Sequence, residues 1–129
     1  MAREFEIDVA GSDLLSKNYS IVVSEKNTDN VKGFKFSQTL IEDITKKHVH
    51  GKSDRAKTML KIRIYCIVVY YIFKSMKIKE GSFLNLSICR DFHGHERDIS
   101  SQLKHLLEQL LKLKINIHHG KLEKDSNAD

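Results

Sequence analysis

Residues 53 to 76 read SDRAKTMLKIRIYCIVVYYIFKSM and contain neither Gly nor Pro. The stretch opens with polar residues and then becomes apolar almost all the way round, with an unbroken apolar run from Ile64 to Phe73. A segment of this length and composition predicts one long helix. Because a helix that is apolar on every side must be covered on more than one face, we expect a sheet on one side of it and another helix on the other.

Three strands are expected before this helix. Residues 4 to 9 alternate strictly, with Phe5 and Ile7 on one side and acids on the other, which is the period of a strand. Residues 19 to 24 are rich in β-branched side chains, and residues 31 to 36 carry two phenylalanines on one face. Because the connections between them are short, we expect an antiparallel meander.

The rest of the chain alternates between helix and strand. Residues 37 to 47 predict a helix, and a polar, flexible stretch over 46 to 52 is expected to end it before the long helix. A strand follows over 83 to 89, then a helix with Asp98 as its N-cap, then a last strand over 115 to 119. The apolar stripe of that second large helix is predicted to consist of Ile99, Leu103, Leu106, Leu107, Leu110 and Leu111.

Length and composition limit the class of protein. The 129 residues predict one α/β domain over 1 to 120 and a flexible tail over 121 to 129. Lys and Arg number 22 against 17 Asp and Glu, an excess that suits contact with phosphates and equally serves solubility. Cys66 and Cys89 both lie in apolar runs, which favours buried thiols in a reducing cytoplasm. The longest apolar run has 10 residues, against about 20 for a membrane span, so we expect no span.

This order of elements resembles the ribonuclease H-like superfamily, whose mixed central sheet has three antiparallel strands followed by alternating helices and strands. Members of that superfamily carry one acid on the first strand and another at the end of the fourth. Asp8, in the segment IDVAGS, matches the first position, and Asp91, in the segment ICRD, matches the second. The resemblance also implies a third acid at the start of the first large helix. Asp54 is the candidate for it, and Glu42 is its rival.

A fourth acid is implied on a later helix, where Glu96 or Asp98 matches. The resemblance therefore implies a metal-dependent nuclease or phosphodiester-processing protein. Two acids on neighbouring parallel strands repel each other unless a cation lies between them, and carboxylate oxygens suit Mg²⁺ or Mn²⁺. His93 or His95 would carry the proton. Basic residues flank the expected site and are predicted to contact nucleic acid: Lys52, Arg55, Arg90 and Arg97.

Each acid also fits a plainer structural interpretation. Asp8 alternates with two glutamates and fits a solvated strand face. Asp54 fits an acid that complements the dipole of the helix it begins, and Asp91 fits a polar turn. A protein of this fold that does not catalyse a reaction, and instead binds nucleic acid or another protein, is therefore the alternative function.

Histidines form the second group of candidates, in the segments HVH (48 to 50), HGHE (93 to 96) and HH (118 to 119). Imidazoles two residues apart on a strand share a face and can chelate one ion, so a transition-metal site is a third interpretation. Solvated loop histidines would give the same pattern. Residues 46 to 57 hold five basic side chains and few acids, which fits contact with a phosphate backbone and also an ordinary solvated loop.

Overall fold

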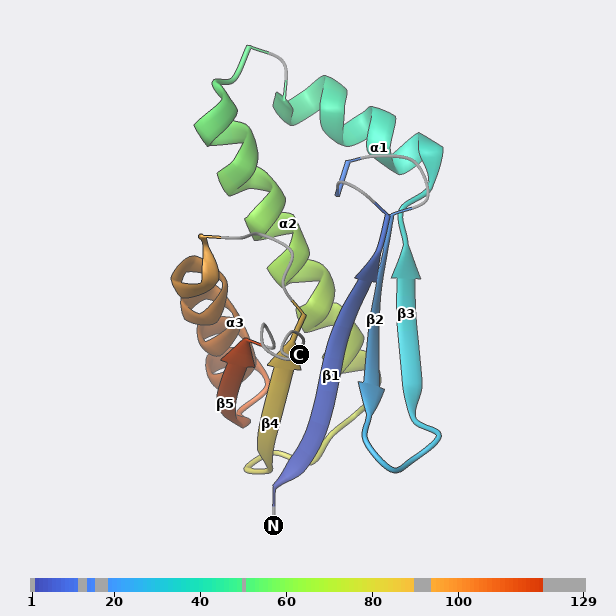
Figure 1. Ribbon diagram of the computed structural model, residues 1–129, viewed down its shortest axis with the longest axis vertical. Coiled ribbons are helices and arrows are strands. Elements are labelled where there is room, and N and C mark those ends of the chain that lie inside the picture. The colour runs from blue at the N-terminus through green and yellow to red at the C-terminus, as the bar shows by residue number, and fades with distance from the viewer. Residues whose placement is uncertain (1, 12–13, 16–18, 50, 90–93, 120–129) are drawn as a thin grey trace, which may run out of the picture.

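The computed structural model describes residues 2–11, 14–15, 19–49, 51–89 and 94–119. Within these ranges, five strands and three α-helices follow one another (Figure 1). A short π-helical segment, η1, lies between the first two helices. The elements are β1 (Arg3–Ala10), β2 (Ser20–Glu25), β3 (Val31–Lys35), α1 (Gln38–Ile44), η1 (Thr45–Val49), α2 (Asp54–Ser75), β4 (Phe83–Ile88), α3 (Glu96–Leu110) and β5 (Lys114–His119).

The strands form one mixed sheet in the order β3-β2-β1-β4-β5. The first three strands are antiparallel neighbours, and β4 and β5 join them parallel to β1. The central position of β1 follows from this order, with β2 on one side of it and β4 on the other. The predicted fold class is confirmed: the chain is a single α/β unit with a ribonuclease H-like mixed sheet, three antiparallel strands followed by alternating helix and strand.

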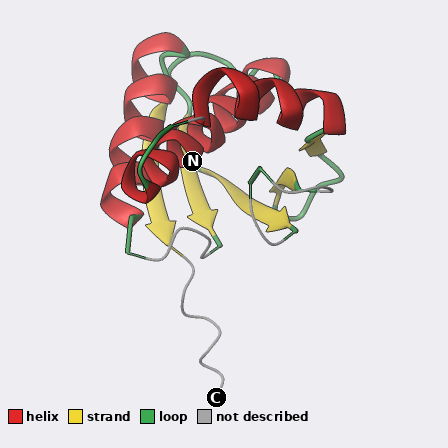
Figure 2. Cartoon of the chain, turned by 90° about the horizontal axis from the view of Figure 1, so that it is seen from above, coloured by secondary structure: helices red, strands yellow, loops and turns green. Residues whose placement is uncertain are grey.

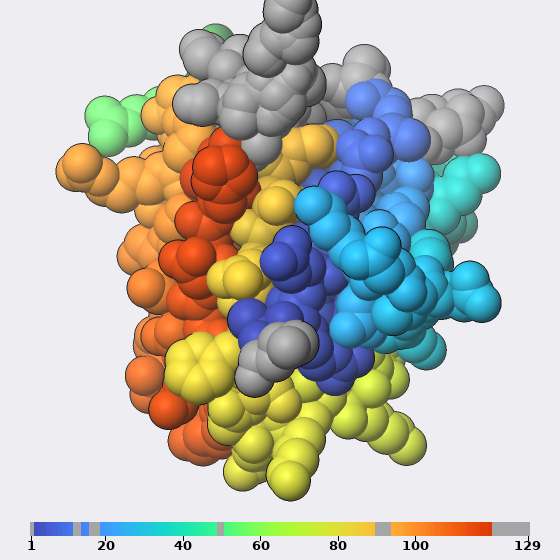
Figure 3. All heavy atoms as spheres, turned by 60° about the horizontal axis from the view of Figure 1, so that its bottom comes forward, coloured from blue at the N-terminus to red at the C-terminus, as the bar shows by residue number. Residues whose placement is uncertain are grey.

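All three helices lie on one side of the sheet (Figure 2). Strand alternation accounts for this, because Phe5 and Ile7 of β1 are buried toward the helices while Glu4, Glu6 and Asp8 are exposed on the opposite side. We call that opposite side the open face. In Figure 3, strands β5, β4, β1 and β2 lie side by side on it, and none of the described helices covers them.

Helix α2 occupies the centre of the fold. It packs against α3 on one side and against β2 and β3 of the sheet. This confirms the prediction that a sheet and another helix together cover this helix, whose sequence is apolar on every side. Phe73 of α2 meets Phe5 of β1 edge to face, with ring centroids 5.2 Å apart. Two side chains on the outer side of α2, Ile67 and Tyr71, nevertheless remain exposed. Among the described residues, no helix combines the length and the hydropathy that a membrane-spanning segment needs.

Two local predictions were wrong. The break predicted over residues 46 to 52 begins later than expected, because Thr45–Val49 follows α1 as a π-helical segment and the chain turns at Gly51. Helix α3 begins two residues before the predicted cap: His95 occupies the N-cap position without a side-chain cap bond, and Asp98 lies in the first turn. Its buried stripe is Ile99, Leu103 and Leu107.

Candidate functional site

The carboxyl ends of β1, β4 and β5 lie at one edge of the sheet, and α2 and α3 begin near the same edge (Figure 1). In open α/β sheets, ligands commonly bind outside this edge. Ile7 of β1 lies opposite Ile88 of β4, and the backbone N–H of Cys89 donates to the carbonyl of Ile7 at 3.0 Å. Asp8 therefore lies level with the first residue after β4.

The predicted partner of Asp8, Asp91, lies outside the described residues, as do His93 and Arg90. The side chain of Asp8 is exposed on the open face, and its Oδ1 accepts a hydrogen bond from the N–H of Val9 at 2.8 Å. The parallel pairing of β1 with β4 is the part of the predicted metal site that the structure does contain.

The predicted third acid and its rival lie on the first two helices. Asp54 is the first residue of α2 and is exposed, and Ser53 before it caps the helix by accepting from the N–H of Ala56 at 3.2 Å. Glu42 lies on α1, where the side-chain amide of Gln38 donates to its Oε2 at 3.0 Å. Glu42 and Asp54 therefore both fit surface positions on helices.

The start of α3 gathers the remaining candidates. Nδ1 of His95 lies 3.3 Å from Oδ2 of Asp98, a contact that ties the entry of the helix to its first turn. Glu96 and Arg97 are the first two residues of α3, and Arg97 is exposed. Negative side chains in this first turn complement the dipole of the helix.

No group of three His, Cys, Asp or Glu that could hold a metal ion occurs within the part of the chain that the structure describes. Asp8, Asp54 and Glu96 are therefore not gathered around one point. The described residues alone do not fit a divalent ion, and they do not fit a transition metal held by histidines. A metal site at this edge requires ligands from outside the described ranges.

Cations are concentrated where the chain turns from α1 into α2. Residues 45 to 58, which we call the basic elbow, contain five Lys or Arg and one acid, Asp54. The resulting net charge of +4 compares with +5 for the whole chain of 129 residues. The basic elbow is one of two segments in which cations clearly outnumber acids, the other being residues 59 to 79, which hold five Lys or Arg and no acid.

The basic elbow extends past the carboxyl end of β1, at the top of the molecule in Figure 1. Gly51 has φ +79° between η1 and α2, a backbone conformation that favours glycine. Lys47 forms an ion pair with Asp43 one turn earlier, at 3.3 Å. The exposed cations of the basic elbow are Lys46, Lys47, Lys52 and Arg55.

The two predicted contacts Lys52 and Arg55 are thus joined by Lys46 and Lys47, which the sequence analysis placed in a flexible loop. A π-helical segment in place of that loop fixes the backbone of these two lysines. The local count of charges had already indicated this segment as a candidate for phosphate contact, because one acid interrupts its five basic residues.

The groups with shifted pKa values lie elsewhere and have structural roles. Two hydrogen bonds from Arg3 to Glu25, at 2.7 and 2.8 Å, lower the pKa of the Glu25 carboxyl and raise that of the Arg3 guanidinium. Burial raises the pKa of the Cys66 thiol to about 12. Neither group lies at the edge of the sheet where β1, β4 and β5 end.

A scan for known protein families finds no match, and a comparison with curated proteins also finds none. Three solved structures from Aquifex aeolicus resemble the chain. A member of the Ppx/GppA protein family is 12% identical with a TM-score of 0.28, and the match covers 93% of this chain and 36% of that one. The Aquifex aeolicus PPX-GPPA enzyme is 10% identical with a TM-score of 0.25, covering 90% and 36%.

The type II variant of the Ppx/GppA phosphatase is 11% identical with a TM-score of 0.25, covering 91% of this chain and 36% of that one. The chain therefore spans about a third of the length of these structures. A likeness at this distance transfers no activity. The strand order and register of the chain itself carry the description of its fold.

Proposed function

We propose that this chain binds nucleic acid through phosphate contacts along the basic elbow. The observation that carries the proposal is a dense group of cations: residues 45 to 58 hold five Lys or Arg and one acid, and four of the five cations are exposed. Phosphate contacts by Lys and Arg supply most of the affinity of binding that does not depend on sequence. The cations project from a turn between two helices, an arrangement that suits an extended polyanion. A reducing cytoplasm is the compartment we propose for it.

The test is a binding titration with fluorescein-labelled oligonucleotides, single-stranded and duplex, followed by anisotropy. The variant Lys46→Gln with Lys52→Gln and Arg55→Gln removes three exposed cations from the elbow. We expect it to bind at least about tenfold more weakly than the natural chain at 0.1 M salt.

The matched control removes three exposed cations from other elements, by Lys32→Gln and Lys35→Gln on β3 and Lys104→Gln on α3. It lowers the net charge by the same amount, so an equal loss of affinity in both variants would mean that overall charge, and not the elbow, attracts the oligonucleotide. Absence of binding by the natural chain at 0.05 M salt would end the proposal.

A second candidate is membership of the ribonuclease H-like superfamily with cleavage of phosphodiesters, aided by Mg²⁺ or Mn²⁺. The parallel neighbours β1 and β4 favour it, because Asp8 lies level with the residue that follows β4. The described residues do not by themselves build an ion site, so this candidate depends on Asp91. Cleavage of an oligonucleotide that requires Mg²⁺ or Mn²⁺ and is lost in Asp8→Asn and in Asp91→Asn would support it.

The control for that assay is Glu4→Gln, which removes an exposed acid from the same face of the same strand. If the chain binds oligonucleotides and leaves them intact in both metals, it is a binding protein without this activity.

A further inference from the structure

A groove lies between α2 and α3, lined by three apolar residues together with Arg63, Ser101, Gln102 and His105. It has a volume of about 540 Å³ and is lined by three residues of α2 and four of α3. Met59 and Ile67 contribute apolar surface from α2, and Leu106 contributes it from α3. We call this feature the α2–α3 groove. It lies between the two helices, where Ile67 of α2 remains exposed.

Exposed apolar side chains extend the surface along both helices. Tyr71 follows Ile67 by one turn of α2, and Leu110 follows Leu106 by one turn of α3. Of the six large apolar side chains exposed among the described residues, three lie here, with Ile67 38%, Leu110 55% and Tyr71 59% exposed.

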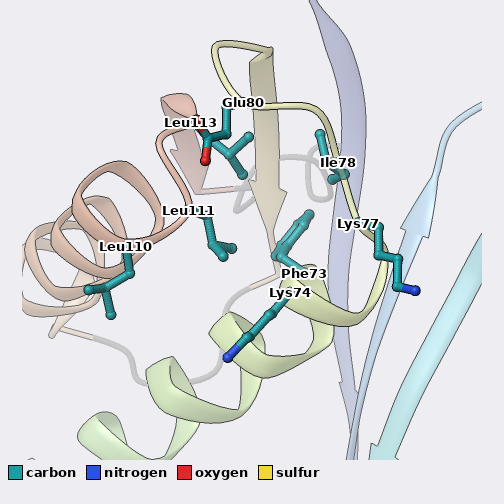
Figure 4. Close-up of a pocket in the computed structure, with 8 residues that line it drawn as sticks. All are labelled: Phe73, Lys74, Lys77, Ile78, Glu80, Leu110, Leu111 and Leu113. Atoms are coloured by element: carbon teal, nitrogen blue, oxygen red, sulfur yellow. The ribbon is translucent and has the colours of Figure 1, made fainter.

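A second hollow, of about 150 Å³, lies at the other end of the same two helices. Leu110 of α3 and Lys74 of α2 extend into the space between the helices, and Leu111 points toward Phe73 (Figure 4). The apolar surface thus runs along the seam between α2 and α3, and not at one isolated spot. Contiguous apolar surface with a polar rim marks sites of interaction with other proteins.

The charges along the seam are mostly positive: the cations that line the two hollows are Arg63, Lys74 and Lys77, and the one acid is Glu80, at the second hollow. Arg63 lines the α2–α3 groove, and no acid is among the residues that line it. Lys74, further along α2, lies 5.9 Å from the ring centroid of Tyr71 and 6.0 Å from that of Tyr70. A second copy of the chain docked here about a twofold axis would bring this mostly positive seam against itself, and like charges across an interface are unfavourable.

We propose that the α2–α3 groove binds an amphipathic helix of another protein, with apolar residues on one face and acidic residues beside them. The apolar residues would occupy the groove between Met59, Ile67 and Leu106, and the acids would pair with Arg63 and Lys74. Recognition of a helix in a groove uses apolar residues spaced three or four apart, and complementary charge selects the partner. This surface does not include the basic elbow, so the inference does not depend on nucleic-acid binding.

Three synthetic 18-residue peptides test it, each labelled with fluorescein and titrated with the whole chain. The first has Leu at helical spacing with flanking Glu, the second has the same Leu with flanking Lys, and the third has the residues of the first in shuffled order. We expect the Glu peptide to bind at least about tenfold more tightly than either of the others.

Two variants locate the site. Ile67→Ser with Tyr71→Ser changes exposed side chains, so the fold should be retained, and it should weaken the Glu peptide about tenfold. Arg63→Glu should reverse the preference, so that the Lys peptide binds more tightly than the Glu peptide. Phe83→Ser, which removes an exposed aromatic side chain on β4, is the matched control and should leave binding unchanged.

Equal binding of the Glu and shuffled peptides would overturn the proposal, and so would unchanged binding in both groove variants. Sedimentation of the natural chain supplies a third readout. If the natural chain is a dimer and the variant Ile67→Ser with Tyr71→Ser is a monomer, the groove binds a second copy of the chain. That result would also overturn the proposal.

Discussion

The packing of α3 makes a quantitative prediction. Leu103 is fully buried in the core, in the middle of the stripe by which α3 contacts the rest of the fold. Leu103→Ala removes its packing and leaves a cavity, and such changes cost about 2–5 kcal/mol. Because α3 packs against both α2 and β5, the surroundings have little freedom to collapse, and we expect a loss of about 3 kcal/mol.

Urea unfolding measures this loss. With an m-value of about 1.5 kcal/mol/M, the midpoint should fall by about 2 M. Leu110→Ala is the matched control, because Leu110 lies on the same helix but is 55% exposed, and it should change stability by less than about 0.5 kcal/mol. Equal midpoints for the two variants, with unchanged m-values, would refute the docking of α3 through Leu103.

Three further predictions concern local interactions. Because the pKa of Glu25 is lowered in the folded state, its carboxylate stabilises the fold at pH values above 4.5, the ordinary pKa, and this stabilisation is lost as the pH falls through the lower pKa of the folded state. The free energy of unfolding should therefore fall less steeply below pH 4.5 in Glu25→Gln than in the natural chain. An unchanged profile would mean that the pair with Arg3 does not contribute to the acid sensitivity. Because burial raises the pKa of the Cys66 thiol to about 12, iodoacetamide at pH 8 should label this thiol only after unfolding. Mass spectrometry of native and urea-treated samples would measure the labelling. Rapid labelling of the native chain would contradict the burial of Cys66. Ser53→Ala removes the cap of α2 and should destabilise the protein by about 1 kcal/mol in thermal unfolding, while no change would mean that the cap bond to Ala56 contributes nothing.

Most of the fold could be predicted because strong local patterns decided it. Strict alternation around Phe5 and Ile7 defined β1, and the absence of Gly and Pro over residues 53 to 76 defined α2. The start of α3 could not be predicted from the preference of Asp98 for N-caps, because His95 takes that position without a side-chain cap bond. The π-helical segment also escaped prediction, since polar residues with two lysines and a histidine resemble a loop.

Less of the candidate site could be predicted from the sequence. Alternation alone placed Asp8 on a strand, and the parallel pairing of β1 with β4 was correctly expected. Whether Asp8 meets Asp91 remains a prediction, because Asp91 is outside the described residues. The α2–α3 groove was missed because an all-round apolar helix does not reveal which of its sides stays uncovered. That depends on where α3 packs, and it left Ile67 and Tyr71 exposed.

The most direct test of nucleic-acid binding by the basic elbow is the dependence of affinity on salt. Each phosphate contact contributes about 0.9 to the slope of log K against log salt for duplex DNA. Replacing Lys46, Lys52 and Arg55 together should therefore reduce the slope by about 2.7, with similar losses on unrelated sequences. A slope equal to that of the natural chain would contradict the account, because it would mean that these three cations contact no phosphate.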